Sequence, residues 1–380
     1  MNWPLVKLGD LCVVKRGTTI TQKEAIEGKV PVVSGGLKPT YFHNSSNRNG
    51  NTITVSGSGA SAGFINFYKE PIFASDCSTV EPKNDTVDVS YIYRAMQNLQ
   101  EYIYTKLKAG AAQPHVYAKD LANLEIPFPP LAEQHRIAAL LDTADHIIKQ
   151  RELAIAKLDQ LAQSVFVEMF GDVVSNNKNW NQLCINEIAA NEKYSIVDGP
   201  FGSSLKPTDY LETGVPVIRI ANVTKDGYFL PKNLLYISKE KFKELKRSSV
   251  CGDDVLVTRV GTIGNTCIFP NNFGDALLST TGVCKIKPNR ELVMPSYLHA
   301  SIKTKSFQAQ INKSASTSVQ KYFNLTALKS WKISIPPLHL QNEFIKKINL
   351  INDEITKHQQ CLHQIKNLEF SLQHQSFAVN

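Results

Sequence analysis

The sequence predicts a mixed α/β (α+β) fold in which two strand-rich domains are separated by two long helices that form an antiparallel coiled coil with pseudo-two-fold symmetry. Three observations support this prediction. One motif occurs twice, each copy opens a long apolar-periodic segment, and the remaining sequence alternates β-branched runs with turn residues. A repeat of this length sets the architecture. The expected boundaries are strand-rich domains at residues 1–128 and 172–335 and helical segments at residues 129–171 and 336–380.

The repeated motif is Ile-Pro-Phe-Pro-Pro-Leu at residues 126–131 and Ile-Ser-Ile-Pro-Pro-Leu at residues 333–338, 207 residues further on. A leucine-rich approach and a glutamine-bearing loop precede each copy, so the repeated unit is roughly fifty residues or longer. Proline is tolerated in the first turn of a helix and forces the preceding residue out of helical conformation. The Pro-Pro pairs therefore mark where both helices begin.

Both helical segments carry apolar residues on a 4-3 spacing, which is typical of a coiled-coil seam. The first seam comprises Ile137, Leu141, Ala144, Ile148, Ile155, Leu158, Ala162, Val165 and Met169, interrupted by Arg151. The second comprises Phe344, Ile348, Ile351, Ile355, Leu362 and Ile365, interrupted by His358. A flanking row on the first helix widens its apolar stripe beyond what one partner helix covers. We expect a partner protein to contact this row, which consists of Leu140, Ile147, Ala154 and Leu161.

In the other segments, β-branched and aromatic runs punctuated by Gly, Asn and Pro predict strands at residues 28–34, 51–57, 214–220 and 254–259. A helix is expected near residues 91–108. The two segments also repeat each other loosely. The correspondence pairs Gly17 with Gly199, the strand at 31–33 with that at 216–218, and the glycines at 59 and 63 with those at 261 and 264.

Two pairs of loops leave their function open. The glycine-rich stretch at 56–63 is followed by a strand pattern, so it does not fit a dinucleotide fingerprint. It and its counterpart at 258–264 are either structural turns or turns that approach phosphates closely. The small-residue loops at 109–115 and 314–321 are either plain connectors or suited to phosphates and adenine edges.

The net charge of +8 is concentrated in one domain. Residues 1–128 carry 13 basic and 11 acidic side chains, and residues 172–335 carry 21 and 13. The helical segment at 129–171 carries 4 basic against 6 acidic side chains, and the segment at 336–380 carries 4 of each. This distribution favours domains that meet a polyanion and helices that meet protein, although a slightly basic protein without a polyanionic partner is the alternative.

Composition and motifs exclude several classes of function. No run of eighteen apolar residues and no signal-peptide layout are found, so we expect a cytoplasmic protein without a membrane partner. The seven scattered cysteines are interpreted as reduced core thiols. No phosphate-binding loop, methyltransferase base-binding motif, nuclease motif or metal-ligand histidine spacing is found. We therefore expect no catalytic residues, no metal and no cofactor.

The whole chain resembles the specificity subunits of type I restriction-modification enzymes. The resemblance rests on the repeated Pro-Pro-Leu sequence at the start of each long helix and on Glu133-Gln134 after its first copy. It also rests on the sequence segments at 198–203, 215–220 and 261–264. It implies two target recognition domains that each read half of a split double-stranded DNA sequence. It also implies spacer helices that dock two methyltransferase subunits, with restriction subunits joining the complex. The second entry departs from the first, because Leu340-Gln341 replaces Glu133-Gln134.

On this interpretation the chain is a non-enzymatic DNA-recognition subunit. The candidate phosphate or guanine contacts are Lys15, Arg16, Lys38, Arg48, Lys206, Arg219, Lys225, Arg259 and Lys321, and the candidate adenine contacts are Gln113, Asn222 and Gln320. Two alternatives stay open. One is a methyltransferase or nuclease that carries its own recognition domain, and the other is a coiled-coil scaffold without a role in DNA binding.

Overall fold

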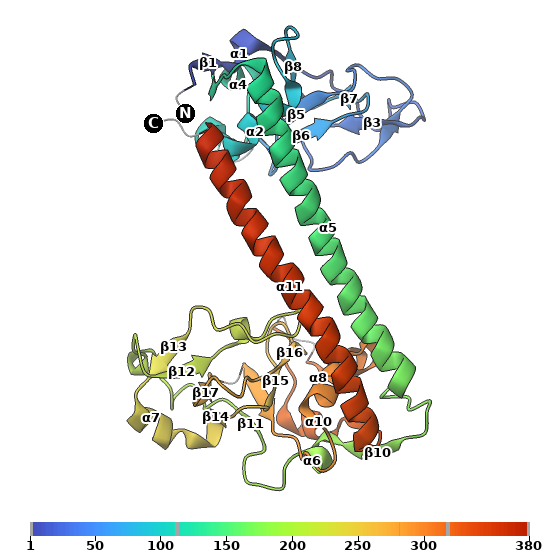
Figure 1. Ribbon diagram of the computed structural model, residues 1–380, viewed down its shortest axis with the longest axis vertical. Coiled ribbons are helices and arrows are strands. Elements are labelled where there is room, and N and C mark those ends of the chain that lie inside the picture. The colour runs from blue at the N-terminus through green and yellow to red at the C-terminus, as the bar shows by residue number, and fades with distance from the viewer. Residues whose placement is uncertain (1–2, 111–113, 281, 317–319, 378–380) are drawn as a thin grey trace. The chain divides into compact units, whose positions relative to one another are not determined.

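The chain forms two compact units in the computed structural model (Figure 1). Unit 1 comprises residues 1–153 and 358–380, and unit 2 comprises residues 154–357. The structure describes residues 3–110, 114–280, 282–316 and 320–377. Within the described residues, no helix is long and apolar enough to cross a membrane.

Unit 1 begins with short strands and ends its globular part at the first Pro-Pro pair. Its elements are β1 (Leu5–Lys7), α1 (Leu8–Leu11), β2 (Cys12–Arg16), β3 (Val30–Val33), β4 (Phe42–His43), β5 (Thr52–Ser56), β6 (Ile65–Tyr68), β7 (Phe73–Ala74), β8 (Cys77–Pro82), α2 (Val89–Asn98), α3 (Gln100–Tyr102), the π-helical turn η1 (Ile103–Leu107), α4 (Ala118–Ala122) and β9 (Glu125–Pro127). The first long helix, α5 (Leu131–Phe170), starts in this unit.

Unit 2 follows the same plan with additional short elements. These are β10 (Asn181–Cys184), α6 (Ile185–Ile188), β11 (Ile196–Asp198), η2 (Pro207–Asp209), β12 (Val215–Ile218), η3 (Ile220–Asn222), β13 (Leu235–Ile237), α7 (Lys239–Glu244), η4 (Lys246–Ser248), β14 (Ser249–Val250), β15 (Val255–Thr258), β16 (Thr266–Ile268), β17 (Ala276–Leu278), β18 (Val283–Ile286), α8 (Pro295–Lys303), α9 (Lys305–Ser314), α10 (Leu325–Ser330) and β19 (Lys332–Ile335). The second long helix, α11 (Leu338–Phe377), starts here and ends in unit 1.

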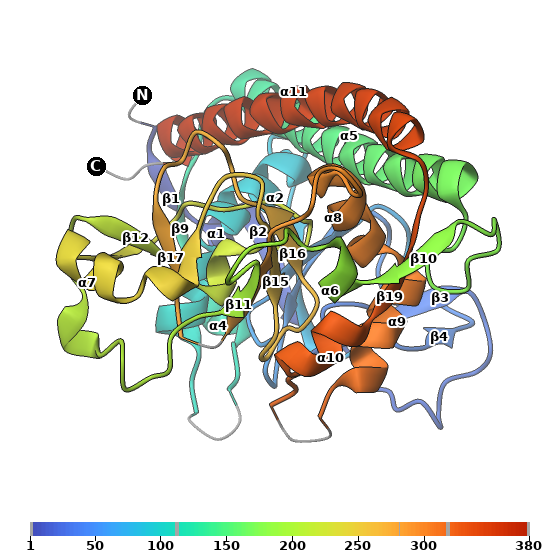
Figure 2. The same cartoon turned by 90° about the horizontal axis from the view of Figure 1, so that it is seen from below.

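The sheets of the two units have matching strand orders. A four-stranded sheet has the order β2-β8-β5-β6 in unit 1 and β11-β18-β15-β16 in unit 2. A second sheet has the order β4-β3-β7 in unit 1 and β13-β12-β17-β14 in unit 2, where β14 adds one edge strand. Figure 2 shows α8 against β15 and β16, and α2 takes the same place against β5 and β6. The repeat seen in the sequence is therefore a repeat of topology.

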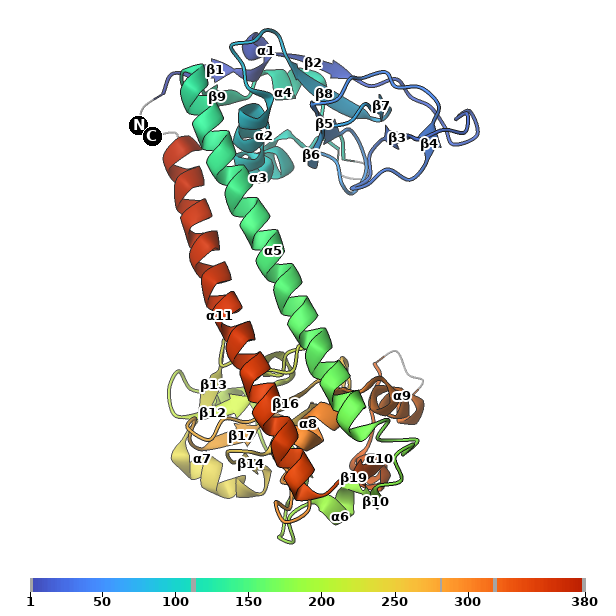
Figure 3. The same ribbon diagram turned by 45° about the vertical axis from the view of Figure 1, so that its right-hand side comes forward.

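Both long helices begin directly after a Pro-Pro pair, as the motif predicts. Within unit 1 the first part of α5 lies beside the last part of α11 (Figure 3), where Glu152 pairs with Lys366 at 2.9 Å. Within unit 2 the rings of Phe166 on α5 and Phe344 on α11 lie 5.4 Å apart. In both units the two helical segments run antiparallel.

One part of the predicted seam is displaced. Toward the end of α5 we expected Val165 and Met169 to be the core positions, but Phe166 and Phe170 are the buried ones. Both phenylalanines pack against Tyr297 of α8 as well as against α11. The reason is that this part of α5 packs on the globular core of unit 2, so its buried stripe is wider and rotated by one residue.

The four predicted strands are present as β3, β5, β12 and β15. The helix expected near 91–108 starts two residues earlier and breaks at Leu99 into α2, α3 and a π-helical turn. The cysteine interpretation was wrong in part. All seven thiols are free, but Cys251 is exposed and Cys184 and Cys361 are only half-buried.

Candidate nucleic-acid interface

A glycine turn follows the equivalent strand in each unit, β5 in unit 1 and β15 in unit 2. The φ angles of Gly59 and Gly261 are +77° and +75°, in the left-handed region that favours glycine. Apart from the glycine itself and its two neighbours in the chain, no described atom lies within 4 Å of the place that a Cβ would take at either residue. The backbone of both turns is therefore open, which allows a phosphate to approach closely.

A second segment is hydrogen-bonded to the turn of unit 1. The amide of Gly59 donates to the carbonyl of Pro114 at 3.1 Å, and the amide of Val116 donates to the carbonyl of Gly57 at 3.1 Å. His115 lies between these two bonds. We call this pair of segments, residues 57–59 and 114–116, the brace of unit 1.

Unit 2 has the same brace, formed by residues 259–261 and 321–323. The amide of Gly261 donates to the carbonyl of Lys321 at 2.9 Å, and the amide of Phe323 donates to the carbonyl of Arg259 at 3.2 Å. Tyr322 takes the position of His115. The brace thus brings together residues from two separate sequence motifs, Arg259 and Gly261 from the glycine stretch at 258–264 and Lys321 from the loop at 314–321.

The Arg259 side chain is already engaged within unit 2. Its guanidinium pairs with Asp198 through Nη1, and its Nε donates to the carbonyl of Phe323 at 3.1 Å. Asp198 also pairs with Arg247 at 3.1 Å, and its carbonyl accepts from the Ser248 hydroxyl at 2.9 Å. Arg259 therefore fixes the brace to β11, and Arg247 is the more exposed of the two guanidinium groups.

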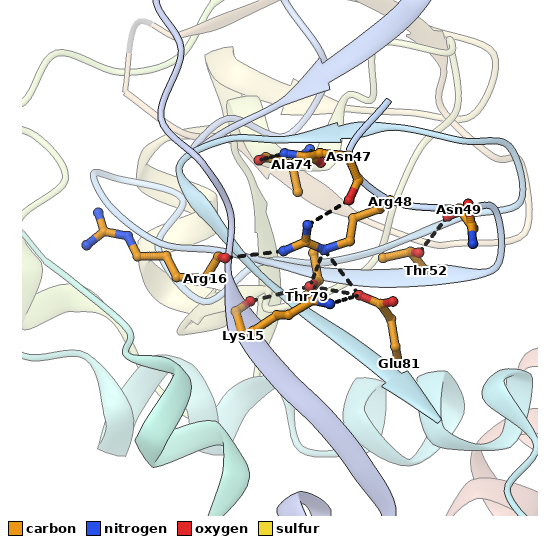
Figure 4. Close-up of polar contacts among 9 residues, drawn as sticks. All are labelled: Lys15, Arg16, Asn47, Arg48, Asn49, Thr52, Ala74, Thr79 and Glu81. Atoms are coloured by element: carbon orange, nitrogen blue, oxygen red, sulfur yellow. Dashed lines mark hydrogen bonds and ion pairs between the residues drawn. The ribbon is translucent and has the colours of Figure 1, made fainter. Parts of the chain in front are cut away.

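Arg48 fulfils a structural role in unit 1 (Figure 4). Its Nε donates to the Thr79 hydroxyl at 2.9 Å and lies 3.1 Å from the Glu81 carboxylate. Its two other nitrogens donate to the carbonyls of Asn47 and Arg16, at 2.7 and 3.2 Å. These contacts engage most of the Arg48 side chain within unit 1, so Arg48 is less available to a polyanion than the exposed Lys15 and Arg16.

The end of β2 presents exposed basic groups beside the glycine turn of unit 1. Arg16 is exposed and lies 3.2 Å from Asp76, whose carboxylate also accepts from the Ser58 hydroxyl of the brace. Lys15 is exposed and lies 3.7 Å from Glu81. Both pairs are solvated and weak, so these cations remain available to a polyanion.

The remaining candidates fall into three groups. Exposed side chains belong to Lys38, Lys206, Lys225, Gln320 and Lys321, and Arg219 is half-buried. Gln113 lies outside the described residues. Asn222 is 0 % exposed, accepts from the Arg219 amide at 2.9 Å and donates to the carbonyls of Leu230 and Lys232. A buried amide with these partners cannot reach a base, so the expectation for Asn222 is corrected.

The same buried glutamine fixes both helix entries. Gln134 accepts from the Asp88 amide at 2.9 Å and donates to the Pro129 carbonyl at 2.9 Å. Gln341 accepts from the Met294 amide at 2.8 Å and donates to the carbonyl of the corresponding proline at 2.8 Å. The glutamine of the Glu133-Gln134 motif is thus a structural residue.

A buried tyrosine joins the globular part to the same entry in each unit. The Tyr91 hydroxyl donates to the Pro127 carbonyl at 2.7 Å, and the Tyr297 hydroxyl donates to the Ser334 carbonyl at 2.6 Å. These contacts align α2 with α8 at an offset of 206 residues, close to the 207 of the long helices.

A charged cluster fills the contact between α2 and the long helices of unit 1. Arg94 lies 2.6 Å from Asp142 and 2.7 Å from Asp145, and it donates to Gln97 at 3.1 Å. Burial and the neighbouring Asp145 carboxylate raise the pKa of Glu369. The cluster therefore places one buried guanidinium among three carboxyl groups.

Unit 2 has a cavity of about 690 Å³ at the matching place. Ala300 takes the position of Arg94, and Asn349 and Asn352 take the positions of the two aspartates. Burial and the nearby Lys303 ammonium lower the pKa of His299, which also lines the cavity, to about 4. Unit 2 thus lacks both the arginine and the two carboxylates that pair with it in unit 1.

The flanking apolar row of α5 is partly uncovered. Leu140 in unit 1 is 41 % exposed, and Leu161 in unit 2 is 48 % exposed. Ile147 and Ala154 are half-buried. Among the described residues, no group of three or more His, Cys, Asp or Glu side chains is placed to hold a metal ion.

Comparison with known proteins identifies the class of this fold. The sequence model of the type I restriction modification DNA specificity domain matches residues 1–157 and 177–367. The chain therefore belongs to the family of type I restriction-modification specificity subunits.

Individual relatives agree with this assignment. The specificity subunit of the type I restriction enzyme MjaVIII from Methanocaldococcus jannaschii is 24 % identical, over 93 % of this chain and 87 % of the relative. The EcoBI specificity subunit from Escherichia coli is 24 % identical, over 78 % and 67 %. The crystal structure of a type I S subunit from M. genitalium shares the fold, with a TM-score of 0.66 and 20 % identity over 100 % of this chain and 97 % of that one.

Sequence reasoning missed several residues of the candidate interface. Asp198 and Arg247 were not recognised as an ion-pair network, because 49 residues separate them. Tyr322 was overlooked because it lies one residue beyond the small-residue loop at 314–321. The available signal was the 207-residue offset, which aligns Tyr322 with His115.

Proposed function

We propose that this chain is the non-catalytic DNA-recognition subunit of a type I restriction-modification complex and reads a bipartite double-stranded target. Residues 1–128 and 172–335 would each be a target recognition domain for one half-site. The observation that carries the proposal is the braced glycine turn, which recurs in both units beside exposed basic residues. An open backbone turn with nearby cations suits a DNA phosphate.

We further propose that the long helices, at residues 129–171 and 336–380, are the spacers and dock two methyltransferase subunits. The exposed part of the α5 row, with Leu140 and Leu161, supports a protein partner. Restriction subunits would join through the assembled complex. In this proposal the chain supplies recognition only, and it needs no cofactor of its own.

A domain exchange tests the recognition proposal. Residues 1–128 are replaced by the corresponding domain of a relative, the protein is co-expressed with its methyltransferase subunit, and modified bases are mapped across the host genome. One half of the bipartite motif should change, and the other half and the gap should stay the same. If both halves change together, the assignment of one domain to one half-site is wrong.

A binding measurement separates the proposal from its alternatives. Binding of the complex to duplex DNA should weaken steeply as salt rises, because phosphate contacts release counterions. A scaffold without a DNA role would show no such binding. Methyl transfer by the purified chain alone would instead support an enzyme with its own recognition domain.

A further inference from the structure

We propose that His115 in unit 1 and Tyr322 in unit 2 are the brace residues that discriminate between bases, one for each half of the DNA target. This inference rests on the proposed function and adds specificity-determining residues to it. Its basis is a contrast within the repeat. At this position the backbone is held by equivalent residues in both units, and the side chain it carries is different.

The backbone of His115 is held on two sides. Its amide donates to the Ala109 carbonyl at 2.8 Å, and its carbonyl accepts from the Ala109 amide at 2.9 Å. On the other side, both its neighbours in the chain are hydrogen-bonded to the glycine turn through the brace. The imidazole therefore projects from a fixed point of the interface.

The backbone of Tyr322 is held by the equivalent residues. The Ser316 amide donates to the Tyr322 carbonyl at 2.8 Å, and the Tyr322 amide donates to the Ser316 hydroxyl at 3.2 Å. Ser316 follows Ala109 by 207 residues, as Tyr322 follows His115. The two loops thus close at the same residue, against the same turn, in both units.

The difference between the His115 and Tyr322 side chains favours contact with bases over contact with phosphates. Both half-sites offer the same phosphates, so a phosphate-binding position has no chemical reason to differ between the units. A base-reading position must differ wherever the two half-sites differ. Imidazole and phenol both donate and accept hydrogen bonds, but they differ in reach and shape. A fixed backbone with an exchangeable polar aromatic side chain suits base reading.

The surroundings of both side chains fit a nucleic acid. Tyr322 is 48 % exposed, and exposed Lys321 precedes it. The ring of His115 stacks on the exposed ring of Tyr117 at 6.1 Å and 16°, and Lys119 lies 5.8 Å from the Tyr117 ring centre. Beside cations that meet duplex phosphates, a polar aromatic side chain can hydrogen-bond to base edges in a groove.

Mapping of methylated sites tests the inference with the full chain in complex with its methyltransferase subunits. Tyr322→Ala and Tyr322→Phe are compared with wild type, and His115→Ala is tested separately. The alanine variants should relax discrimination at one base pair of one half-site by about tenfold. Tyr322 variants should affect one half-site and His115→Ala the other. Tyr322→Phe keeps the ring, so it isolates the contribution of the hydroxyl.

Matched controls come from the same units. Lys193-Tyr194 has the same two residue types as Lys321-Tyr322 but lies outside the brace, and Tyr194 is 42 % exposed. Tyr194→Ala should therefore leave the recognised DNA motif unchanged. His135 is an exposed histidine on α5, and His135→Ala serves in unit 1. The inference is overturned if the wild-type complex modifies a bipartite motif and both alanine variants modify the same motif with unchanged melting temperatures. That outcome leaves the proposed function intact. A wild-type complex without a bipartite motif overturns both.

Discussion

Arg151 and His358 occupy the same position of the repeated helix, 207 residues apart, and Nη1 of Arg151 lies 3.0 Å from Nδ1 of His358. In an antiparallel pair of repeated helices, equivalent positions face each other at one level only, and these two polar residues take that level. Because the guanidinium can only donate, Nδ1 of His358 accepts and its ring proton is on Nε2. The two interruptions of the seam therefore satisfy each other.

Replacing both residues by leucine should stabilise unit 1. A half-buried polar pair in an apolar seam specifies register at a cost in stability, and a well-packed apolar pair removes that cost. We expect a gain of about 1 kcal/mol for Arg151→Leu with His358→Leu, measured by thermal unfolding. Arg151→Leu alone should stabilise less, because it leaves the histidine unpaired. A lower melting temperature for the double variant would show that the pair is net stabilising.

The helix-entry glutamines should each contribute strongly to stability. Gln134→Ala leaves the Asp88 amide and the Pro129 carbonyl without their partner in a buried site. The expected loss is about 2–3 kcal/mol, measured by denaturant unfolding. Gln341→Ala should cost a similar amount in unit 2. The control is Gln150→Ala on the exposed face of α5, which should change stability by less than about 0.5 kcal/mol.

Substitutions within the Arg94 cluster should have strongly non-additive effects on the free energy of unfolding. Arg94→Ala leaves Asp142 and Asp145 without their cation and should lower the free energy of unfolding by about 2–3 kcal/mol. The loss is smaller than for a fully buried ion pair, because Asp142 is half exposed. Adding Asp142→Asn and Asp145→Asn should recover part of the loss, because unit 2 carries this combination at Ala300, Asn349 and Asn352. Additive losses across the three substitutions, measured by urea unfolding, would contradict this coupling.

Unit 2 should lose stability in acid through His299. Burial and Lys303 lower its pKa from 6.5 to about 4, so the folded state resists protonation. The stability that the neutral ring supplies is present above about pH 6.5, and it is lost as the pH falls from there toward 4. The full effect is on the order of 3 kcal/mol. The unfolding midpoint of His299→Gln should fall less between pH 7 and pH 5 than that of wild type; an equal fall would remove His299 as the cause.

The exposed α5 row should be needed for the methyltransferase partner. Leu140→Glu with Ile147→Glu places two charges on the apolar surface and should abolish co-purification of that subunit. Leu368→Glu, on exposed surface of α11 in unit 1, is the matched control and should still co-purify. Unit 1 should keep its far-ultraviolet circular dichroism in both variants. Co-purification of the double variant at wild-type stoichiometry would place the docking surface elsewhere.

Local signals in the sequence were sufficient for the two long helices and for four of the strands. Proline chemistry determined where α5 and α11 begin, and alternation with turn residues located β3, β5, β12 and β15. The 207-residue offset determined which residues of the long helices and of the segments just before them are equivalent, and the glycine turns were matched by their pattern after a predicted strand. These features depend on residues close together in the chain or on a repeated motif, so no long-range contact is needed to find them.

Only the tertiary structure decided which polar side chains face solvent. Asn222 and Arg48 looked like DNA contacts in sequence. Asn222 is buried and donates to the carbonyls of Leu230 and Lys232, and Arg48 contacts the Arg16 carbonyl and the Glu81 carboxylate, which lie more than thirty residues away in the chain. Arg259 is held by Asp198, 61 residues away. The physical reason is that a side chain's availability depends on every group packed around it, and most of those groups arrive from elsewhere in the chain. Periodicity located the helices, but packing on Tyr297 decided that Phe166 is buried rather than Val165.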